Sequence, residues 1–325
     1  MCTAICYGNR FFGRTLDYER SFGESLILAP RNCLTLDGGQ AKYTAFGVGV
    51  IDMGEILFFD GVNECGLGGA ALNFRGYAHY HDFTGGRGEV DSSRLISYVL
   101  GSCRNVGEAR DFLSSVRLTR EEGRESSPLH WIFSDGRESI VYESEKGGAY
   151  VRENPVGILT NSPSLDYHLT RLADYANLTD TSPRLGQNHS NIKLYSRGLG
   201  AFGLPGDFSS SSRFVRAHFV RENIREYRQN ALFDSTNMRD GGVLSFFHIL
   251  DSVSVPNGCV VTDEGRDVLT LYSSCIDLTE QIYYFKSYNS PTIRGVKLTQ
   301  SLCRLDEIKT MSLYKAEPIK LCEFM

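Results

Sequence analysis

The chain begins with Met1-Cys2-Thr3-Ala4-Ile5 and soon continues with Phe12-Gly13-Arg14-Thr15-Leu16-Asp17. Both stretches have the β-branched, aromatic and small side chains of strands, and a short polar turn separates them. Because a short turn brings the second strand back along the first, we expect Arg14 and Asp17 to lie beside Cys2.

Cys2 is the candidate catalytic nucleophile. Removal of Met1, which bacteria favour before a small second residue, would leave a thiol and a free α-amine on one residue. An α-amine has a pKa of about 7.7–8.0, so part of it is neutral at pH 7 and can take a proton from the thiol. Activation of a nucleophile by its own N-terminal amine is an established arrangement.

The residues expected beside Cys2 suit this chemistry. A guanidinium from Arg14 would favour the thiolate, and the Asp17 carboxylate would orient the amine. The alternatives are simpler: Cys2 is an ordinary buried strand residue, and Arg14 and Asp17 form a surface ion pair.

Two asparagines at strand ends, Asn73 and Asn161, are candidates for stabilising an oxyanion. A rigidly held amide N–H is what the developing charge needs, and one such donor lowers the barrier by roughly 3–4 kcal/mol. The alternative for each asparagine is to cap a turn.

Hydrophobic periodicity predicts alternating blocks of strands and helices. Residues 2–73 are predicted to form an antiparallel meander, and two helices follow between Asp91 and Val116, capped by Asp91 or Ser92 and by Asn105. Further predictions are strands over 130–133, 139–143, 148–152 and within 259–296, helices over 211–224 and 243–253, and a long excursion over 174–206. The predicted fold class is therefore α+β, with antiparallel sheets covered by helices on their outer faces.

Composition excludes several classes of protein. The 325 residues are 41% hydrophobic and 22% charged, with a formal net charge of −5 and no concentrated basic stretch, so we expect no nucleic-acid partner. The longest apolar runs fall far short of the roughly 20 residues of a membrane span. The opening residues do not read as a secretory leader, so we expect a cytoplasmic protein. We also expect one domain over residues 1–325.

Two other motifs have residue types that occur in binding sites. His79 and His81 would share one face of a strand, but no third ligand is evident, so we expect no metal site. The aromatic residues Phe22, Phe58 and Phe59 would suit an apolar groove, although core packing is the more frequent role for each.

Five blocks of the sequence resemble the choloylglycine hydrolases, a family that contains bile salt hydrolases and penicillin V acylases. The blocks occur in the family's order, and the likeness runs from residue 1 to about residue 290. They are Met1-Cys2-Thr3-Ala4-Ile5, Phe12-Gly13-Arg14-x-x-Asp17, residues 63–74 ending in Leu72-Asn73-Phe74, residues 154–163 ending in Asn161-Ser162-Pro163, and residues 203–216 containing Ser212-Arg213-Phe214.

The resemblance implies an N-terminal nucleophile hydrolase with a four-layer αββα sandwich, which needs no cofactor and is commonly a homotetramer. Carried over by position, Cys2 matches the nucleophile, and Arg14 and Asp17 match the pair that flanks it. Asn73 and Asn161 match the oxyanion and α-amine contacts, and Arg213 matches a second arginine of the site. The chain departs from the family pattern at Thr15, where asparagine is frequent, and at Arg75, where proline is frequent.

The substrates that the resemblance implies are bile acids conjugated to glycine or taurine. Asparagine at the position of Asn73 favours bile salts over penicillin V, and Leu16, Phe22, Phe58 and Phe59 are expected to line the substrate pocket. One alternative keeps the same site but acts on penicillin V or an N-acyl homoserine lactone. Another is a bile-salt-binding protein without activity, in which Met1 is retained.

Overall fold

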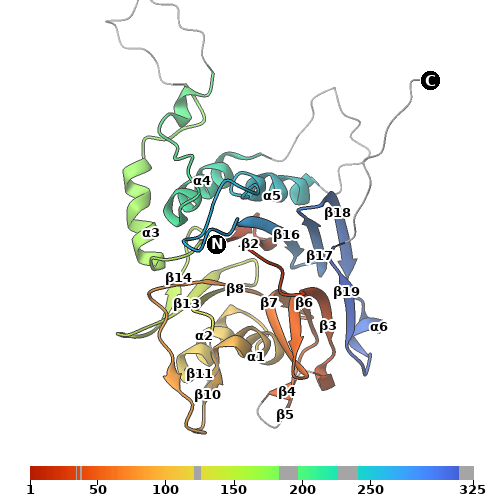
Figure 1. Ribbon diagram of the computed structural model, residues 1–325. Coiled ribbons are helices and arrows are strands. Elements are labelled where there is room, and N and C mark those ends of the chain that lie inside the picture. Colours follow the sequence, from red (N-terminus) through yellow and green to blue (C-terminus); the bar gives the residue numbers. More distant parts are fainter. Residues whose placement is uncertain (34, 37–38, 121–125, 183–196, 226–240, 315–325) are drawn as a thin grey trace, which may run out of the picture.

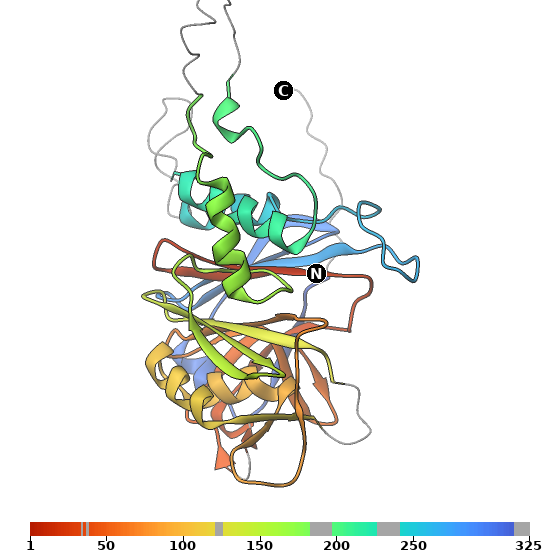
Figure 2. The ribbon, with the colours of Figure 1, turned by 90° about the vertical axis from the view of Figure 1, so that its left-hand side faces the viewer.

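The computed structural model describes residues 1–33, 35–36, 39–120, 126–182, 197–225 and 241–314. Two large antiparallel sheets lie face to face at its centre, and helices cover the outer side of each (Figure 1). The view turned by 90° shows the same four layers (Figure 2). The predicted α+β fold with an αββα order of layers is confirmed.

The first sheet contains the N-terminal hairpin at its centre. Its six strands, in spatial order, are β15 (Ile158–Leu159), β1 (Cys2–Tyr7), β2 (Phe11–Tyr18), β16 (Leu269–Asp277), β17 (Ile282–Ser287) and β18 (Ser290–Lys297). Strands β1 and β2 pair with Cys2 opposite Leu16 and Ala4 opposite Arg14, as the predicted hairpin requires. A side chain at Gly13 would collide with the carbonyl of Ser274 at 2.1 Å, so glycine lets β2 lie this close to β16.

The second sheet faces the first. Its eight strands, in spatial order, are β14 (Gly148–Glu153), β13 (Ser139–Glu145), β12 (Leu129–Ser134), β8 (Gly68–Asn73), β7 (Glu55–Asn63), β6 (Ala45–Asp52), β3 (Ser25–Ala29) and β19 (Lys309–Ser312). The prediction of one meander over residues 2–73 is wrong, because the chain changes sheets between β2 and β3. Side chains on both faces of β2 are buried, and a strand buried on both faces has no alternation that would assign it to a sheet.

The helices form the outer layers. Against the second sheet lie α1 (Leu95–Ser102) and α2 (Val106–Ser115), and the predicted cap is present because Asn105 Oδ1 accepts from the Glu108 amide at 2.9 Å. Against the first sheet lie α4 (Ser210–Asn223) and α5 (Gly241–Asp251), as predicted within one or two residues. Two short helices, α3 (Leu165–Arg171) and α6 (Gln300–Cys303), were not predicted.

The remaining elements are short. They are the parallel sheet of β9 (His81–Asp82), β10 (Glu89–Asp91) and β11 (Arg117–Arg120), the pair β4 (Thr35–Leu36) and β5 (Gly39–Gln40), and the 3-10 turns η1 (Arg31–Cys33), η2 (Ser92–Arg94), η3 (Leu172–Tyr175) and η5 (Leu199–Ala201). Part of the predicted excursion over 174–206, residues 183–196, lies outside the described residues. Residues 259–268, predicted to belong to a strand block, contain only an isolated bridge between Val261 and Asp267.

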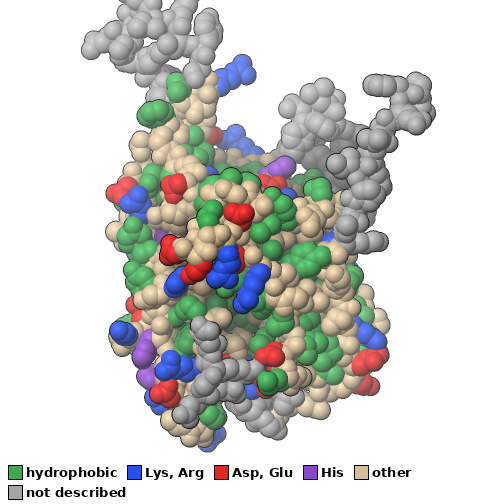
Figure 3. Space-filling model, viewed as in Figure 1, with side chains coloured by type: hydrophobic (Ala, Val, Ile, Leu, Met, Phe, Trp, Pro, Cys, Tyr) green, Lys and Arg blue, Asp and Glu red, His purple; other side chains and the backbone are tan. Residues whose placement is uncertain are grey.

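Two hydrophobic clusters hold the layers together. One joins the inner faces of both sheets to α4 and α5 and includes Cys2, and the other lies between the second sheet and α1 and α2. On the face in Figure 3, basic and acidic side chains are interspersed among apolar ones. Among the described residues, none of the helices is long and apolar enough to cross a membrane.

Candidate active site

The sulfur of Cys2 accepts a hydrogen bond from Arg14. Arg14 Nη2 lies 2.7 Å from Cys2 Sγ, and both side chains are buried between the sheets. Arg14 Nη1 donates across to the second sheet, to the carbonyls of Ala71 at 2.5 Å and Phe59 at 3.1 Å. These bonds fix the guanidinium at the sulfur, where its charge favours the thiolate.

A buried carboxylate, Asp60, balances the charge of Arg14. Its oxygens accept hydrogen bonds from the hydroxyls of Ser274 at 3.0 Å, Tyr272 at 3.2 Å and Tyr283. Burial opposes the charged form of Arg14, but nearby acidic groups, among them Cys2, Asp60 and Asp17, outweigh it and raise the Arg14 pKa. Burial raises the pKa of Asp60 as well, and the Arg14 charge counteracts that effect. The sequence analysis missed Asp60, although a carboxylate inside the apolar run of β7 was a visible signal.

Asp17 lies at the other side of Cys2. Its carboxylate accepts from Thr270 Oγ1 at 2.7 Å and from Thr15 Oγ1 at 3.2 Å, so Thr15, which departs from the family pattern, serves to hold Asp17. The backbone of Asp17 is paired with Met1: the Met1 amine donates to Asp17 O at 2.5 Å, and the Asp17 amide donates to Met1 O at 2.9 Å. Met1 therefore extends the β1–β2 pairing by one residue.

Asn161 connects Cys2 to Arg213. Asn161 Oδ1 accepts from the backbone nitrogen of Cys2 at 2.8 Å and from Arg213 Nη2 at 2.6 Å. Arg213 Nη1 also donates to Cys2 O at 2.5 Å and to Thr3 Oγ1 at 2.7 Å. Burial lowers the Arg213 pKa, and the nearby charges at Asp17 and Cys2 oppose that effect. The structure thus brings Cys2, Asn161 and Arg213 into one hydrogen-bonded group.

Asn73 reaches this group through its backbone. Its carbonyl accepts from Asn161 Nδ2 at 2.8 Å, while its side-chain Oδ1 accepts from the Arg75 amide at 3.0 Å. The carboxamide of Asn73 therefore closes a turn, as the simpler interpretation had it, and the residue still lies next to Asn161.

Three of the four expected pocket residues lie on the Cys2 side. Leu16 pairs with Cys2 across the hairpin, and the Phe22 ring lies 5.4 Å from Phe59, whose carbonyl contacts Arg14. Phe58 is different: it is 2% exposed and packs in the cluster under α1 and α2, on the opposite face of β7. Phe58 is core, because neighbouring residues of a strand point to opposite faces.

Tyr18 is an aromatic residue of the site that the sequence analysis missed. Its ring lies 4.7 Å from that of Phe22, and burial and the nearby charge of Glu19 raise its pKa, with a smaller contribution from Cys2. Tyr18, Phe22 and Phe59, which we call the aromatic group, form a partly exposed apolar surface on the Cys2 side.

The pair considered for metal binding, His79 and His81, has ring centroids 5.4 Å apart. Within the described part of the chain, no group of three or more His, Cys, Asp or Glu side chains is placed to hold a metal ion.

The chain is similar in sequence and in fold to known hydrolases. A family model described as linear amide C–N hydrolases, choloylglycine hydrolase family, matches residues 2–311. A bile salt hydrolase/transferase from Lactiplantibacillus plantarum is 38% identical over 309 residues, which are 92% of each protein. The crystal structure of a mutant conjugated bile acid hydrolase from Clostridium perfringens has a TM-score of 0.87 at 31% identity and covers 99% of this chain and 100% of that one. Penicillin V acylase from Agrobacterium tumefaciens shares the fold, with a TM-score of 0.73 at 22% identity over 95% of this chain and 90% of that one.

Proposed function

Because the chain belongs to the choloylglycine hydrolase family of linear amide C–N hydrolases, we propose that it is a bile salt hydrolase with Cys2 as its nucleophile. The substrates would be glycine- or taurine-conjugated bile acids. The observation that carries this proposal is the hydrogen bond of 2.7 Å from Arg14 to Cys2 Sγ, on the residue whose backbone nitrogen Asn161 holds.

Removal of Met1 would complete the site. The nitrogen of Cys2 already lies 2.8 Å from Asn161 Oδ1, and as a free amine it would keep that acceptor. The same cleavage would release the amide of Asp17 from Met1 O. The amine, the thiol and the Asp17 backbone would then meet at one end of the β1–β2 hairpin.

In the first half of the reaction, the α-amine takes the thiol proton and Cys2 Sγ attacks the amide carbonyl. N–H donors at Asn73 and Asn161 would stabilise the charge on the carbonyl oxygen, at roughly 3–4 kcal/mol for each well-placed donor. The amine then gives its proton to the nitrogen of glycine or taurine as the C–N bond breaks. The acyl group remains on Cys2 as a thioester.

In the second half, water attacks the thioester. The amine of Cys2 accepts a proton from the water and returns it to the sulfur as the C–S bond breaks. The free bile acid leaves, and the enzyme regains its starting state.

Most of the binding free energy would come from the apolar steroid. The aromatic group of Tyr18, Phe22 and Phe59 offers an apolar surface beside Cys2, and burial of apolar surface contributes about 25 cal/mol per Å². Substrates that share the amide but lack the steroid should therefore bind more weakly.

Product analysis tests the proposal directly. Purified protein is mixed with taurocholate, glycocholate, penicillin V and an N-acyl homoserine lactone in parallel. The expected result is release of taurine or glycine at a higher kcat/KM than cleavage of the other two. Faster hydrolysis of penicillin V or the lactone would assign the same site to the alternative substrate.

The intact mass of the same sample tests the remaining alternative. A bile-salt-binding protein without activity would retain Met1, whereas the active enzyme must have lost one methionine residue. We further propose that the protein acts in the cytoplasm as a homotetramer, so that its mass in solution would be about four times 36.3 kDa.

A further inference from the structure

A histidine behind the active site, His130, is completely buried between polar partners. It lies on β12, where Nδ1 is 3.1 Å from Glu143 Oε1 and Nε2 is 3.0 Å from the carbonyl of Thr160. Neither His130 nor Glu143 has any solvent-exposed side-chain surface. The mechanism above uses neither residue.

The partners of His130 fix the orientation of its ring. A carbonyl oxygen only accepts, so Nε2 must carry a proton. Glu143 Oε1 also accepts from the Leu165 amide at 3.0 Å, and Oε2 forms an ion pair with Arg152 Nη1 at 3.2 Å. Within the described residues neither Glu143 Oε2 nor Arg152 Nη1 has a hydrogen-bond partner, so Glu143 is held through Oε1. The ring of His130 is thus fixed at both nitrogens, with Nε2 as the donor to the backbone.

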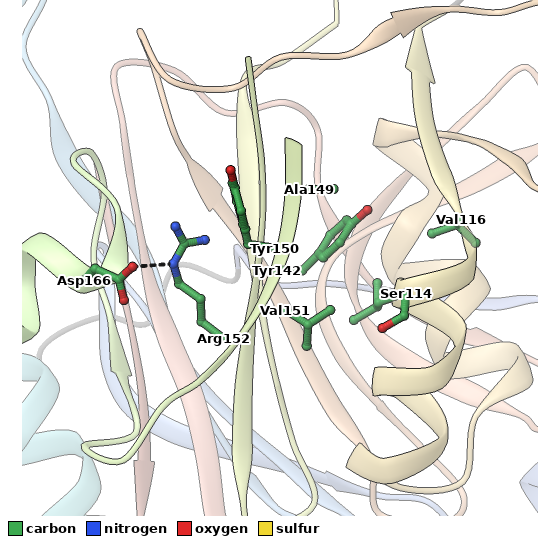
Figure 4. Close-up of a pocket in the computed structure, with 9 residues that line it drawn as sticks. Ser114, Val116, Tyr142, Ala149, Tyr150, Val151, Arg152 and Asp166 are labelled. Carbon is green, nitrogen blue, oxygen red and sulfur yellow. Dashed lines mark hydrogen bonds and ion pairs between the residues drawn. The ribbon is translucent and has the colours of Figure 1, made fainter. Parts of the chain in front are cut away.

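Arg152 ties this buried pair to the surface. Its Nε donates to Asp166 at 2.9 Å, as Figure 4 shows at the edge of a cavity of about 570 Å³. Tyr142 also lines that cavity, and its buried hydroxyl has no hydrogen-bond partner among the described residues. Tyr142 is thus adjacent to Glu143 in sequence yet outside its hydrogen-bond network.

The hydrogen bonds of Glu143 and His130 lead to the backbone of Thr160, next to Asn161. Strand β15 stops at Leu159, so pairing with β1 does not hold the next two residues. Side chains hold them instead: His130 donates to Thr160 O, Ser210 Oγ accepts from the Asn161 amide at 2.9 Å, and His168 Nε2 donates to Asn161 O at 2.9 Å.

His130 also contacts the chain segment on the other side of the hydrogen bond between Asn161 and Asn73. Its ring stacks on Phe74, with centroids 4.4 Å apart and planes inclined by 10°. Phe74 follows Asn73, whose carbonyl receives the hydrogen bond from Asn161 Nδ2. Stacked rings attract each other beyond the effect of the area that they bury. His130 therefore holds both chain segments that meet at this hydrogen bond.

We propose that His130 is a positioning residue: held by Glu143 at Nδ1, it fixes Thr160 and Phe74 and so sets the Asn161 carboxamide between Cys2 and Asn73. The effect on turnover rests on the proposed function of Cys2 and Asn161. The hydrogen bond from His130 Nε2 to the backbone of Thr160 does not.

The first experiment is ¹⁵N NMR of the histidine side chains in the wild-type protein at pH 7, with assignment by the His130→Gln variant. The expected spectrum for His130 has a proton on Nε2, the nitrogen that faces the Thr160 carbonyl. A ring without a proton on Nε2 would overturn the proposal, and this result is independent of any activity on bile salts.

The second experiment separates positioning from folding. In His130→Gln we expect kcat for taurocholate to fall roughly 10- to 100-fold with KM within about twofold, because misplacement by about 1 Å has effects of this size. Alkylation of Cys2 by iodoacetamide depends on the thiolate beside Arg14 and should change by less than about twofold. The matched control Tyr142→Phe should keep kcat.

Two outcomes would overturn the positioning role. One is a folded His130→Gln variant with wild-type kcat. The other is a loss of kcat that alkylation of Cys2 follows in proportion, because that would mean general damage to the site. If the wild-type protein cleaves no conjugated bile salt, the proposed function fails, while the NMR result still decides the state of His130.

Discussion

Asn161 Oδ1 accepts a hydrogen bond from the backbone nitrogen of Cys2 at 2.8 Å, across 159 positions of sequence. The same oxygen accepts from Arg213. His168 and Ser210 hold the backbone of Asn161 by hydrogen bonds. The Asn161 side chain in turn fixes the Cys2 nitrogen, which would become the catalytic base.

Replacement of Asn161 by alanine should lower kcat by roughly 100- to 1000-fold, the effect of losing one preorganised donor at an oxyanion. The amine of Cys2 would also lose its acceptor. Steady-state kinetics with taurocholate measure the loss. Asn223→Ala, which removes a carboxamide bonded to Phe219 O at the end of α4, is the control and should retain activity. Equal rates for the two variants would exclude Asn161 from the site.

Cys2→Ser should nearly abolish turnover while the fold is retained, because a hydroxyl is a far weaker nucleophile than a thiolate. Cys6→Ser is the matched control on the same strand. Burial raises the pKa of Cys6, so its thiol stays protonated and we expect its replacement to leave kcat unchanged. Circular dichroism confirms folding of both variants. A fully active Cys2→Ser protein would require a different nucleophile.

Arg14→Lys should reduce kcat by about 100-fold even though the charge is kept. A single ammonium cannot donate at once to Cys2 Sγ, Ala71 O and Phe59 O, as the forked guanidinium does. Alkylation of Cys2 should slow as well, in contrast to His130→Gln. Arg10→Lys is the control, because Arg10 directly precedes the same strand but pairs with Asp277 rather than with Cys2. Unchanged alkylation in Arg14→Lys would contradict a role in thiolate stabilisation.

Stability should depend on pH through His168. Burial lowers its pKa from 6.5 to about 4. Between these values the unfolded state binds more protons than the folded state, so the free energy of unfolding rises with pH and is lost as pH falls from about 6.5 to 4. The contribution is at most about 3 kcal/mol.

Urea unfolding at several pH values between 4 and 7 measures this slope. His168→Gln keeps an N–H donor for Asn161 O but does not titrate, so the slope should become shallower. His248→Gln, at an exposed position on α5, should leave it as in the wild type. Identical slopes in all three proteins would contradict the assignment.

The hairpin that holds Cys2, Arg14 and Asp17 could be predicted from sequence, because its contacts are local. The contact expected between Asn161 and the α-amine, and the role expected for Arg213, came from the family resemblance, since no periodicity connects residues so far apart. His130 and Glu143 escaped notice for a related reason. Their pairing depends on β12 lying beside β13 and on where β15 ends, and neither residue stands out in its own strand.

The aromatic pair Phe58 and Phe59 illustrates a limit of another kind. Alternation along a strand dictates that only one of two neighbours can face the site. The sequence contains no indication of which one, because both faces of β7 are packed against other layers. Burial under α1 assigns Phe58 to the core.

The backbone pairing of Met1 with Asp17 has a consequence for biosynthesis. A peptidase that trims the first residue needs an extended, unpaired substrate, whereas a β-hairpin closes within about 1–10 μs once both strands are available. If Met1 is removed, the cleavage therefore has to occur while the nascent chain is too short to form the hairpin, or after the pairing of Met1 with Asp17 has opened. Molecules in which the hairpin forms first would be folded but inactive until that pairing opens.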